Sequence, residues 1–248
     1  FISYLSILIF SLLLSILPRN ISLILGKMFG LAIYRVFPIR KKVALKNIQD
    51  NFTKLTNKEH LNILKNTYIH FGMVFSEFIR QQTLNINNIN SIINIDQKTI
   101  ETLNKNKGSI IMTGHIGNWE YFLPLFGLNN LKFSIVAQRI KNPYLNNLFL
   151  KIRSFKNVEI IFKSEGKDKM LKALKDDYHL GLASDQNAGR KGVDVQFLNH
   201  KISIPKGAAI FHIKTKKPIF IGYCIMKKNY TYEFKLKLLD TSDINFEK

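Results

Sequence analysis

The sequence predicts an α/β fold: a single-domain sandwich with a mixed, largely parallel central sheet flanked by helices, preceded by an N-terminal membrane-anchor helix. Three observations predict it. Hydrophobic residues make up 46% of the 248 residues, which is enough for a large core. Short β-like runs alternate with helical stretches from residue 92 onward. The first seventeen residues carry no charge.

Residues 1–17, FISYLSILIFSLLLSIL, form the predicted anchor. As a helix they would be about 25 Å long, against roughly 30 Å for the hydrocarbon core of a bilayer. The chain opens on Phe rather than Met, so we expect upstream residues and a longer span. A buried core helix and a secretory signal are the alternatives, but a signal should show a basic start and a small-x-small cleavage site.

The next apolar stretch, residues 21–37, carries Lys27 and Arg35 and suits a helix lying in the membrane interface. Three basic residues follow at 40–42, and the first acidic residue is Asp50. By the positive-inside rule, this one-sided charge places the rest of the chain in the cytoplasm.

The rest of the chain alternates helices and strands. Thr56 and Glu59 form a capping box, and the apolar periodicity after it predicts a long amphipathic helix to about Gln82. Predicted strands cover residues 92–95, 109–113, 133–137, 158–162, 180–183, 193–198 and 219–225, with a late antiparallel strand at 230–239. Predicted helices cover residues 97–104, 119–126, 143–155, 167–177 and 206–215.

The amino-acid composition favours a negatively charged binding partner but does not identify it. The chain has 37 Lys and Arg against 17 Asp and Glu, a formal net charge of +20. Such a surplus suggests an anionic partner: nucleic acid, an anionic membrane, a phosphorylated substrate or an acidic carrier protein. Part of the surplus reflects the abundance of Lys, Asn and Ile that is usual for AT-rich genomes. Cys224, the one cysteine, excludes an internal disulfide and a multi-cysteine zinc site, and we expect it in the core.

The segment TGHIGNWE, residues 113–120, carries the clearest chemical signal. His115 follows a predicted strand, at the carboxyl end where open α/β sheets bind ligands, and Asn118 is a good cap for the next helix. If His115 lies in the turn and Glu120 on the first helical turns, the carboxylate can accept the proton of one imidazole nitrogen. The other nitrogen is then free as a general base. Alternatively, His115 is a turn residue and Glu120 merely favours the helix N-terminus.

This segment resembles the His-x4-Asp/Glu motif of the bacterial lipid A biosynthesis late acyltransferases, the lauroyl and myristoyl transferase family of the glycerolipid acyltransferase superfamily. Other blocks are similar to that family in order and spacing: Gln138-Arg139 with Asn142-Pro143, then Arg153, residues 184–193 (SDQNAGRKGV), and Pro205-x-Gly207-Ala208-Ala209 before Lys217-Pro218. The family's Phe-Phe-Gly turn reads Phe197-Leu198-Asn199 here, where Asn199 could replace the glycine.

The resemblance implies transfer of a fatty acyl chain from an acyl carrier protein thioester to a hydroxyl of a lipid A precursor of the Kdo-lipid IV-A type. It implies no cofactor, no metal and no nucleic acid. The partners would be the carrier protein, an anionic phosphorylated lipid acceptor and the lipids of the bacterial inner membrane, with catalysis on the cytoplasmic face. Residues 1–40 would form the anchor and interfacial helix, and residues 41–248 the catalytic domain, truncated at its C-terminus.

Roles follow for seven residues. His115 would be the general base, oriented by Glu120. Arg139 and Arg153 would bind substrate phosphate or stabilise charge, because guanidinium makes bidentate contacts. The remaining substrate-binding residues would be Asp185 and Gln186, which line the acceptor pocket, and Asn118.

Other readings stay open. A sibling enzyme of the superfamily could act on a lysophospholipid, a mannosylated lipid or an ornithine lipid, because a base of this kind activates any hydroxyl. A metal-dependent hydrolase with His115, Glu120 and Asp185 as ligands would need a further ligand at metal spacing, which the sequence lacks. A nucleic-acid-binding protein should show a finger, an RRM signature or a concentrated basic arm.

Overall fold

The computed structural model describes residues 2–198 and 200–242. Its contacts divide the chain into two compact units, Phe1–Thr83 with Gln196–His200, and Leu84–Val195 with Lys201–Lys248. The predicted boundary near residue 40 concerns membrane anchoring and stays a prediction. Asn199, the predicted substitute for the family's turn glycine, lies outside the described residues.

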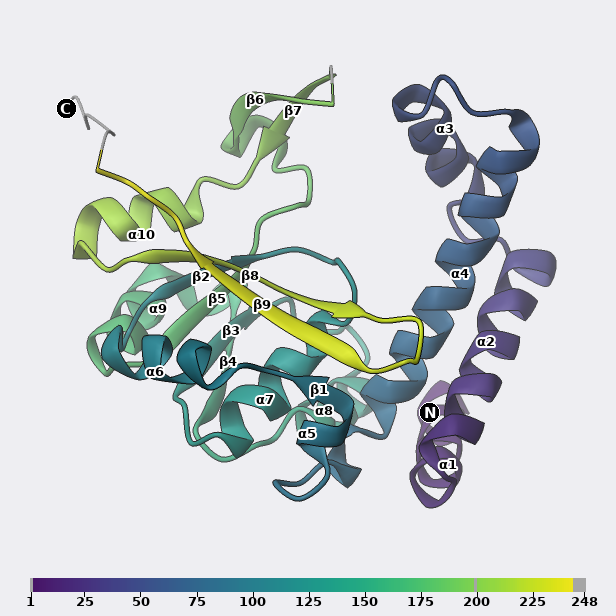
Figure 1. The fold of residues 1–248 in the computed structure, drawn as a ribbon, viewed down its shortest axis with the longest axis horizontal. Helices are drawn as coiled ribbons and strands as arrows, with labels where there is room; N and C mark the ends of the chain where they lie inside the picture. Colours follow the sequence, from purple (N-terminus) through teal and green to yellow (C-terminus); the bar gives the residue numbers. More distant parts are fainter. Residues whose placement is uncertain (1, 199, 243–248) are drawn as a thin grey trace. The chain divides into compact units, whose positions relative to one another are not determined.

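Residues 2–83 of the first unit are helical (Figure 1). The capping box is confirmed: the Glu59 amide donates to Thr56 Oγ1 at 3.3 Å, and the Thr56 amide donates to Glu59 Oε2 at 2.7 Å. The long helix ends at Ile79, three residues before the predicted end, and continues as a 3₁₀ turn. The elements are α1 (Ile2–Ile16), α2 (Arg19–Val36), α3 (Lys41–Asn51), α4 (Asn57–Ile79) and η1 (Gln81–Thr83), of which α3 was not predicted.

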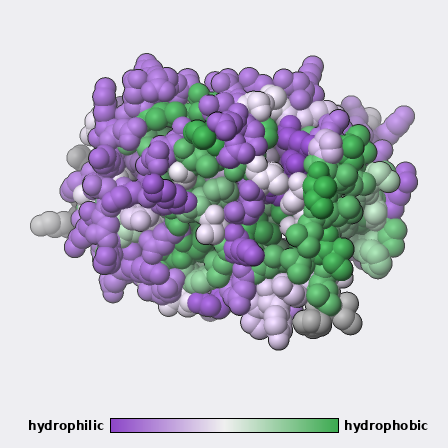
Figure 2. All heavy atoms as spheres, turned by 90° about the horizontal axis from the view of Figure 1, so that it is seen from below, coloured by the Kyte–Doolittle hydropathy of each residue, from purple (hydrophilic) through white to green (hydrophobic). Residues whose placement is uncertain are grey.

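Large apolar side chains cover much of the outer surface of α1 and α2 (Figure 2). The most exposed are Ile9, Leu12, Ile16, Met28 and Val36. Tested by length and hydropathy, none of the described helices suffices alone as a membrane span, whereas α2 and α3, which meet at 96°, pass the test as one bent pair. Membrane anchoring by residues 1–17 stays a prediction.

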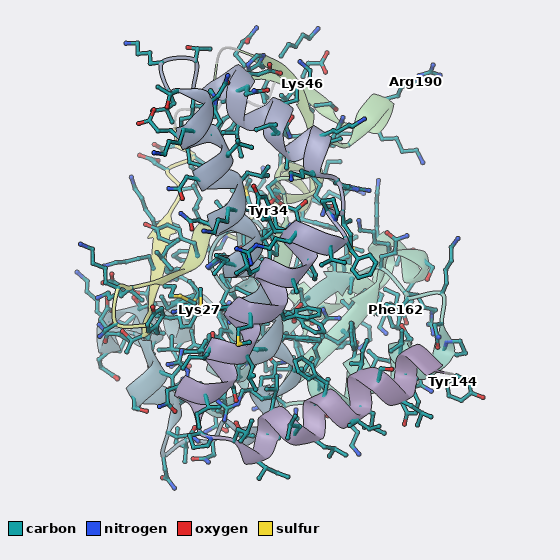
Figure 3. The ribbon with its side chains drawn as sticks, turned by 90° about the vertical axis from the view of Figure 1, so that its right-hand side faces the viewer. Lys27, Tyr34, Lys46, Tyr144, Phe162 and Arg190 are labelled. Carbon is teal, nitrogen blue, oxygen red and sulfur yellow. The ribbon has the colours of Figure 1, made fainter. Side chains whose placement is uncertain are left out.

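The inward faces of these helices mix small residues with leucines: Ser11 and Leu14 are buried in α1, and Ser22 and Leu23 in α2. Gly26 and Gly30 of α2 pack directly on the backbone of α4 around Gly72. Farther along α2, Tyr34, labelled in Figure 3, meets Tyr68 of α4 with ring centroids 5.6 Å apart. Close backbone approach at the glycines and aromatic contacts, including Phe29 of α2 on Phe75 of α4 with ring centroids 5.7 Å apart, therefore hold α2 against α4.

The second unit is built on a seven-stranded sheet with strand order β1-β9-β8-β2-β5-β3-β4 (Figure 1). Every neighbouring pair is parallel except β8 and β9, so the predicted mixed, mostly parallel sheet is confirmed. The strands are β1 (Ile93–Asn94), β2 (Ile110–Thr113), β3 (Phe133–Ala137), β4 (Val158–Phe162), β5 (His179–Ala183), β8 (Ile219–Met226) and β9 (Tyr232–Leu238). A separate two-stranded sheet contains β6 (Val193–Phe197) and the unpredicted β7 (His200–Ile204).

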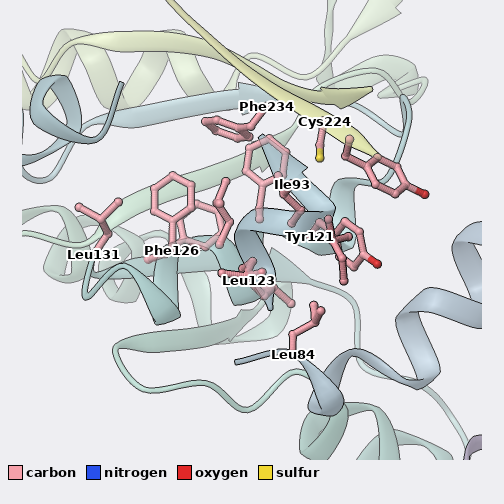
Figure 4. Close-up of a cluster of buried hydrophobic side chains, with 14 of the residues drawn as sticks. Leu84, Ile93, Tyr121, Leu123, Phe126, Leu131, Cys224 and Phe234 are labelled. Atoms are coloured by element: carbon pink, nitrogen blue, oxygen red, sulfur yellow. The ribbon is translucent and has the colours of Figure 1, made fainter. Parts of the chain in front are cut away.

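Helices cover both faces of the large sheet, which gives the predicted sandwich. One core cluster joins α5, α6 and α7 to the sheet and contains Phe126, Phe234 and the fully buried Cys224 (Figure 4). The other joins α9 and α10 to the opposite face. These elements are α5 (Ile89–Ile92), α6 (Gln97–Lys105), η2 (Trp119–Tyr121), α7 (Phe122–Leu128), α8 (Pro143–Ile152), η3 (Lys163–Glu165), α9 (Gly166–Lys175), η4 (Gly189–Lys191) and α10 (Gly207–Thr215).

Candidate active site

The site lies where β2 and β5 leave the sheet side by side. The two strands are parallel in the register Ile110↔Leu180 to Thr113↔Ala183, so the residues after them emerge at the same edge. His115 and Asp185 each follow two positions after their strand ends. Gly114 permits the approach, because a Cβ there would lie 3.0 Å from the Asp185 side chain. The predicted placement of Asp185 and Gln186 at the sheet edge of His115 is therefore confirmed.

The Asp185 carboxylate accepts hydrogen bonds from two groups of His115. The His115 backbone amide donates to Asp185 Oδ2 at 2.8 Å, and His115 Nδ1 lies 3.0 Å from Oδ1. Partial burial raises the pKa of Asp185, but the bonds from the His115 amide and ring outweigh it, so the pKa of this carboxyl is below its usual value. An ionised carboxylate only accepts, so Nδ1 carries a proton, and in the neutral imidazole Nε2 then has the free lone pair.

The His115 ring is fixed and still reachable from solvent. Its side chain is 33% exposed, and Nε2 makes no hydrogen bond with any residue that the structure describes. Trp119 packs edge-on against the imidazole, with ring centroids 4.8 Å apart. A ring held on one side, with a free nitrogen on the other, is the arrangement that a general base requires.

Glu120 binds a different partner from the one predicted. Arg153, at the C-cap of α8, donates from Nε to Glu120 Oε2 at 2.9 Å and from Nη2 to Oε1 at 2.5 Å. Glu120 is buried, and the Arg153 side chain is 22% exposed. The predicted bond between Glu120 and His115 is not among the contacts of the described residues, because this bidentate pair occupies the carboxylate and Asp185 occupies Nδ1.

The turn between these pairs is tightly constrained. Gly117 has a φ of 63°, and a Cβ there would collide with the carbonyl oxygen of Cys224. The next amide, of Asn118, donates to the same carbonyl at 2.9 Å. Asn118 is fully buried at the N-cap of η2, but its side chain makes no cap hydrogen bond. The backbone N–H of Asn118 is used by the hydrogen bond to the Cys224 carbonyl, so it is not available to donate to an oxyanion.

The other predicted site residues stand farther along the same edge. Arg139, two positions after β3, is exposed and stacks over Phe162, with the guanidinium carbon 4.1 Å from the ring centroid. Gln186 is exposed beside Asp185. No described contact joins either residue to His115. Within residues 2–198 and 200–242, no three His, Cys, Asp or Glu side chains are grouped to hold a metal ion, so the hydrolase reading gains no support.

Comparison with known proteins agrees with the resemblance. A phosphatidylinositol mannoside acyltransferase of Mycolicibacterium smegmatis is 26% identical over 137 residues, which cover 54% of this chain and 45% of that protein. The aligned part thus spans about half the length of the curated relative. The family model described as bacterial lipid A biosynthesis acyltransferase matches residues 1–243. The chain therefore belongs to the bacterial lipid A biosynthesis acyltransferase family.

Proposed function

We propose that the protein transfers a fatty acyl chain from an acyl carrier protein thioester to a hydroxyl of a lipid A precursor of the Kdo-lipid IV-A type. The observation that carries this proposal is the His115–Asp185 pair at the carboxyl ends of two adjacent parallel strands. Family membership supports the reaction class and a lipid acceptor.

His115 acts as the general base through Nε2. The acceptor hydroxyl oxygen attacks the thioester carbonyl carbon while its proton passes to Nε2. The carbon–sulfur bond then breaks, and the imidazolium gives the proton to the departing thiolate. Asp185 holds the ring in the required tautomer and stabilises the imidazolium that forms.

Glu120 is proposed to act through Arg153 rather than on the imidazole. The bidentate pair fixes the guanidinium beside the catalytic turn, since Glu120 is five residues after His115 in the same short segment. Arg153 then supplies fixed positive charge for the reacting carbonyl or for a substrate phosphate.

Arg139, Gln186 and Asn118 complete the proposed substrate-binding set in different ways. Arg139 is exposed, and its stacked guanidinium keeps a defined orientation for the phosphate of the acceptor. Gln186 presents an exposed amide at the same edge. Asn118 supports the set only indirectly, by tying the turn to Cys224.

The proposed place of action is the cytoplasmic face of the bacterial inner membrane. The apolar surface of α1 and α2 and the bent pair α2 and α3 support membrane attachment. The three basic residues at 40–42 have the sign that attracts an anionic leaflet. The formal net charge of +20 would attract an acidic carrier protein and a phosphorylated lipid.

A second acceptor is favoured by one comparison. The Mycolicibacterium smegmatis relative is named for a mannosylated phosphatidylinositol, and its match covers 54% of this chain. A glycolipid of that class is therefore the second candidate, with the same base and the same thioester chemistry.

The test is direct transfer by the full chain in detergent. Radiolabelled acyl carrier protein thioester is mixed with the lipid A precursor in one reaction and with phosphatidylinositol mannoside in another, and acyl coenzyme A replaces the donor in a third. Label on the lipid A precursor from the carrier protein supports the first candidate. Label only on the mannoside supports the second, and wild-type protein that labels no acceptor contradicts both.

A further inference from the structure

A pocket of about 150 Å³ opens at the edge of the large sheet opposite to His115, where β3 and β5 begin. Its position separates it from the proposed acyl transfer, because His115 and Asp185 follow the other ends of β2 and β5. The lining residues are Asn104, Lys107, Asn130, Leu131, Lys132, Asp177 and His179. All of them belong to the second unit.

His179 forms the buried part of this lining. The residue is 1% exposed, and its Nδ1 lies 2.6 Å from Oγ of Ser109, which is fully buried. The backbone fixes it between two strands: its amide donates to the Lys132 carbonyl, and the Leu180 amide donates to the Ser109 carbonyl, each at 2.9 Å. His179 is thus a rigid, deeply buried polar side chain that faces a pocket.

Ser109 determines which imidazole nitrogen carries the proton. The Ser109 hydroxyl makes no other hydrogen bond with the described residues, so its hydrogen is satisfied only if it donates to Nδ1. Nε2 of His179 then carries the hydrogen, and it has no acceptor among the described residues. Burial lowers the pKa of His179 to about 4, so the ring is a neutral donor at pH 7.

Two lysines, Lys107 and Lys132, add positive charge to the lining of this pocket. Lys107 makes no ion pair within the described residues and is exposed. The Lys132 ammonium donates to the Asp176 carbonyl at 3.1 Å, which leaves two further N–H groups. Asp177 is the acidic lining residue, and the Lys217 ammonium 4.0 Å away compensates its charge.

We propose that this pocket binds a small oxyanion of the phosphate class. His179, Lys107 and Lys132 line the same pocket, and their side chains carry the Nε2–H group and two ammonium groups as donors. A pocket of about 150 Å³ has room for a phosphate group. The group is either free phosphate or the terminal phosphate of a larger monoester.

The experiment titrates the full chain, in detergent and labelled with ¹⁵N-histidine, with inorganic phosphate. The Nε2 resonance of His179 is followed by NMR, and chloride at matched ionic strength is the control salt. A parallel titration with glycerol phosphate distinguishes a monoester from the free ion. The test variant is Lys107→Ala with Lys132→Ala, and the matched control is Lys105→Ala, an exposed lysine outside the pocket.

We expect a saturable shift of the His179 resonance with phosphate, unchanged in Lys105→Ala and with about tenfold weaker affinity or worse in the double variant. Tighter binding of glycerol phosphate would assign the site to a monoester, and tighter binding of phosphate to the free ion. An equal shift with chloride, an equal affinity in the double variant, or no shift in the wild type would overturn the proposal.

Discussion

Asp185→Asn separates the role of the carboxylate from the shape of its side chain. The carboxylate accepts from both the amide and Nδ1 of His115, at 2.8 and 3.0 Å. An amide can accept one of these bonds, but its NH₂ group favours a Nδ1 that accepts. That tautomer moves the hydrogen to Nε2, the nitrogen that must take the hydroxyl proton. General base catalysis typically contributes about 10²–10⁴-fold, so kcat should fall by that factor, or about 3–5 kcal/mol of barrier.

Steady-state transfer with the labelled thioester measures kcat and KM separately. KM should change little, because Asp185 acts through the imidazole. The free energy of unfolding should change by less than about 1 kcal/mol, because both side chains are about one third exposed. Asp194→Asn is the matched control: it removes the same charge from an exposed pair with Lys201 at 2.9 Å. A kcat within threefold of wild type in Asp185→Asn would refute the assigned role.

Three further predictions concern other parts of the molecule. Glu120→Ala should abolish transfer and lower the free energy of unfolding by about 3 kcal/mol, because the Arg153 guanidinium loses its buried partner; denaturant unfolding measures the loss. The His179 side chain has a pKa of 6.5 in the unfolded chain and about 4 in the folded protein, so only the unfolded state gains a proton between these pH values. The free energy of unfolding of the wild type should therefore fall by up to about 3 kcal/mol as the pH is lowered from 6.5 to 4. His179→Gln should lack this pH-dependent loss, which thermal unfolding at several pH values measures. Gly72→Ala should cost about 1–3 kcal/mol in denaturant unfolding, because the new Cβ would meet the Gly26 carbonyl oxygen.

Each of these predictions has its own control. Adding Arg153→Ala to Glu120→Ala should recover part of the lost stability, and a loss that simply adds would argue against the pair. A pH profile of His179→Gln parallel to that of wild type would contradict a neutral buried imidazole. Gly207→Ala is the control for the helix glycines, since its Cβ would meet only the Leu182 side chain, at 3.8 Å. Equal stability changes at Gly72 and Gly207 would show that backbone contact is not the cause.

Much of the sheet was predictable because β-like runs and helical stretches differ in period. The strand at 158–162 and the late antiparallel strand both appear in the structure, since each buries an apolar face. α3 was missed because it buries none of its residues, so it has no apolar period to detect. β7 was missed because it pairs with β6 outside the main sheet.

The candidate site was predictable only in part. The rule that ligands bind at strand ends placed His115 and Asp185 at one edge. The hydrogen bonds between His115 and Asp185 form because β2 and β5 are neighbours, and the order of strands in a sheet cannot be deduced from local sequence patterns. The ion pair between Glu120 and Arg153 could not be predicted either, because Arg153 lies 33 residues away on another helix. His179 carried no signal at all, since its hydroxyl partner Ser109 is 70 residues distant.

Mass spectrometry of lipid A tests the central claim most directly. The protein and its His115→Ala variant are expressed in a bacterial strain that lacks its own late acyltransferase, and membrane fractions confirm equal amounts of both. The account predicts that lipid A gains the mass of one acyl chain with the wild-type protein and none with His115→Ala. Unchanged lipid A with the wild-type protein, or an equal gain with His115→Ala, would contradict it.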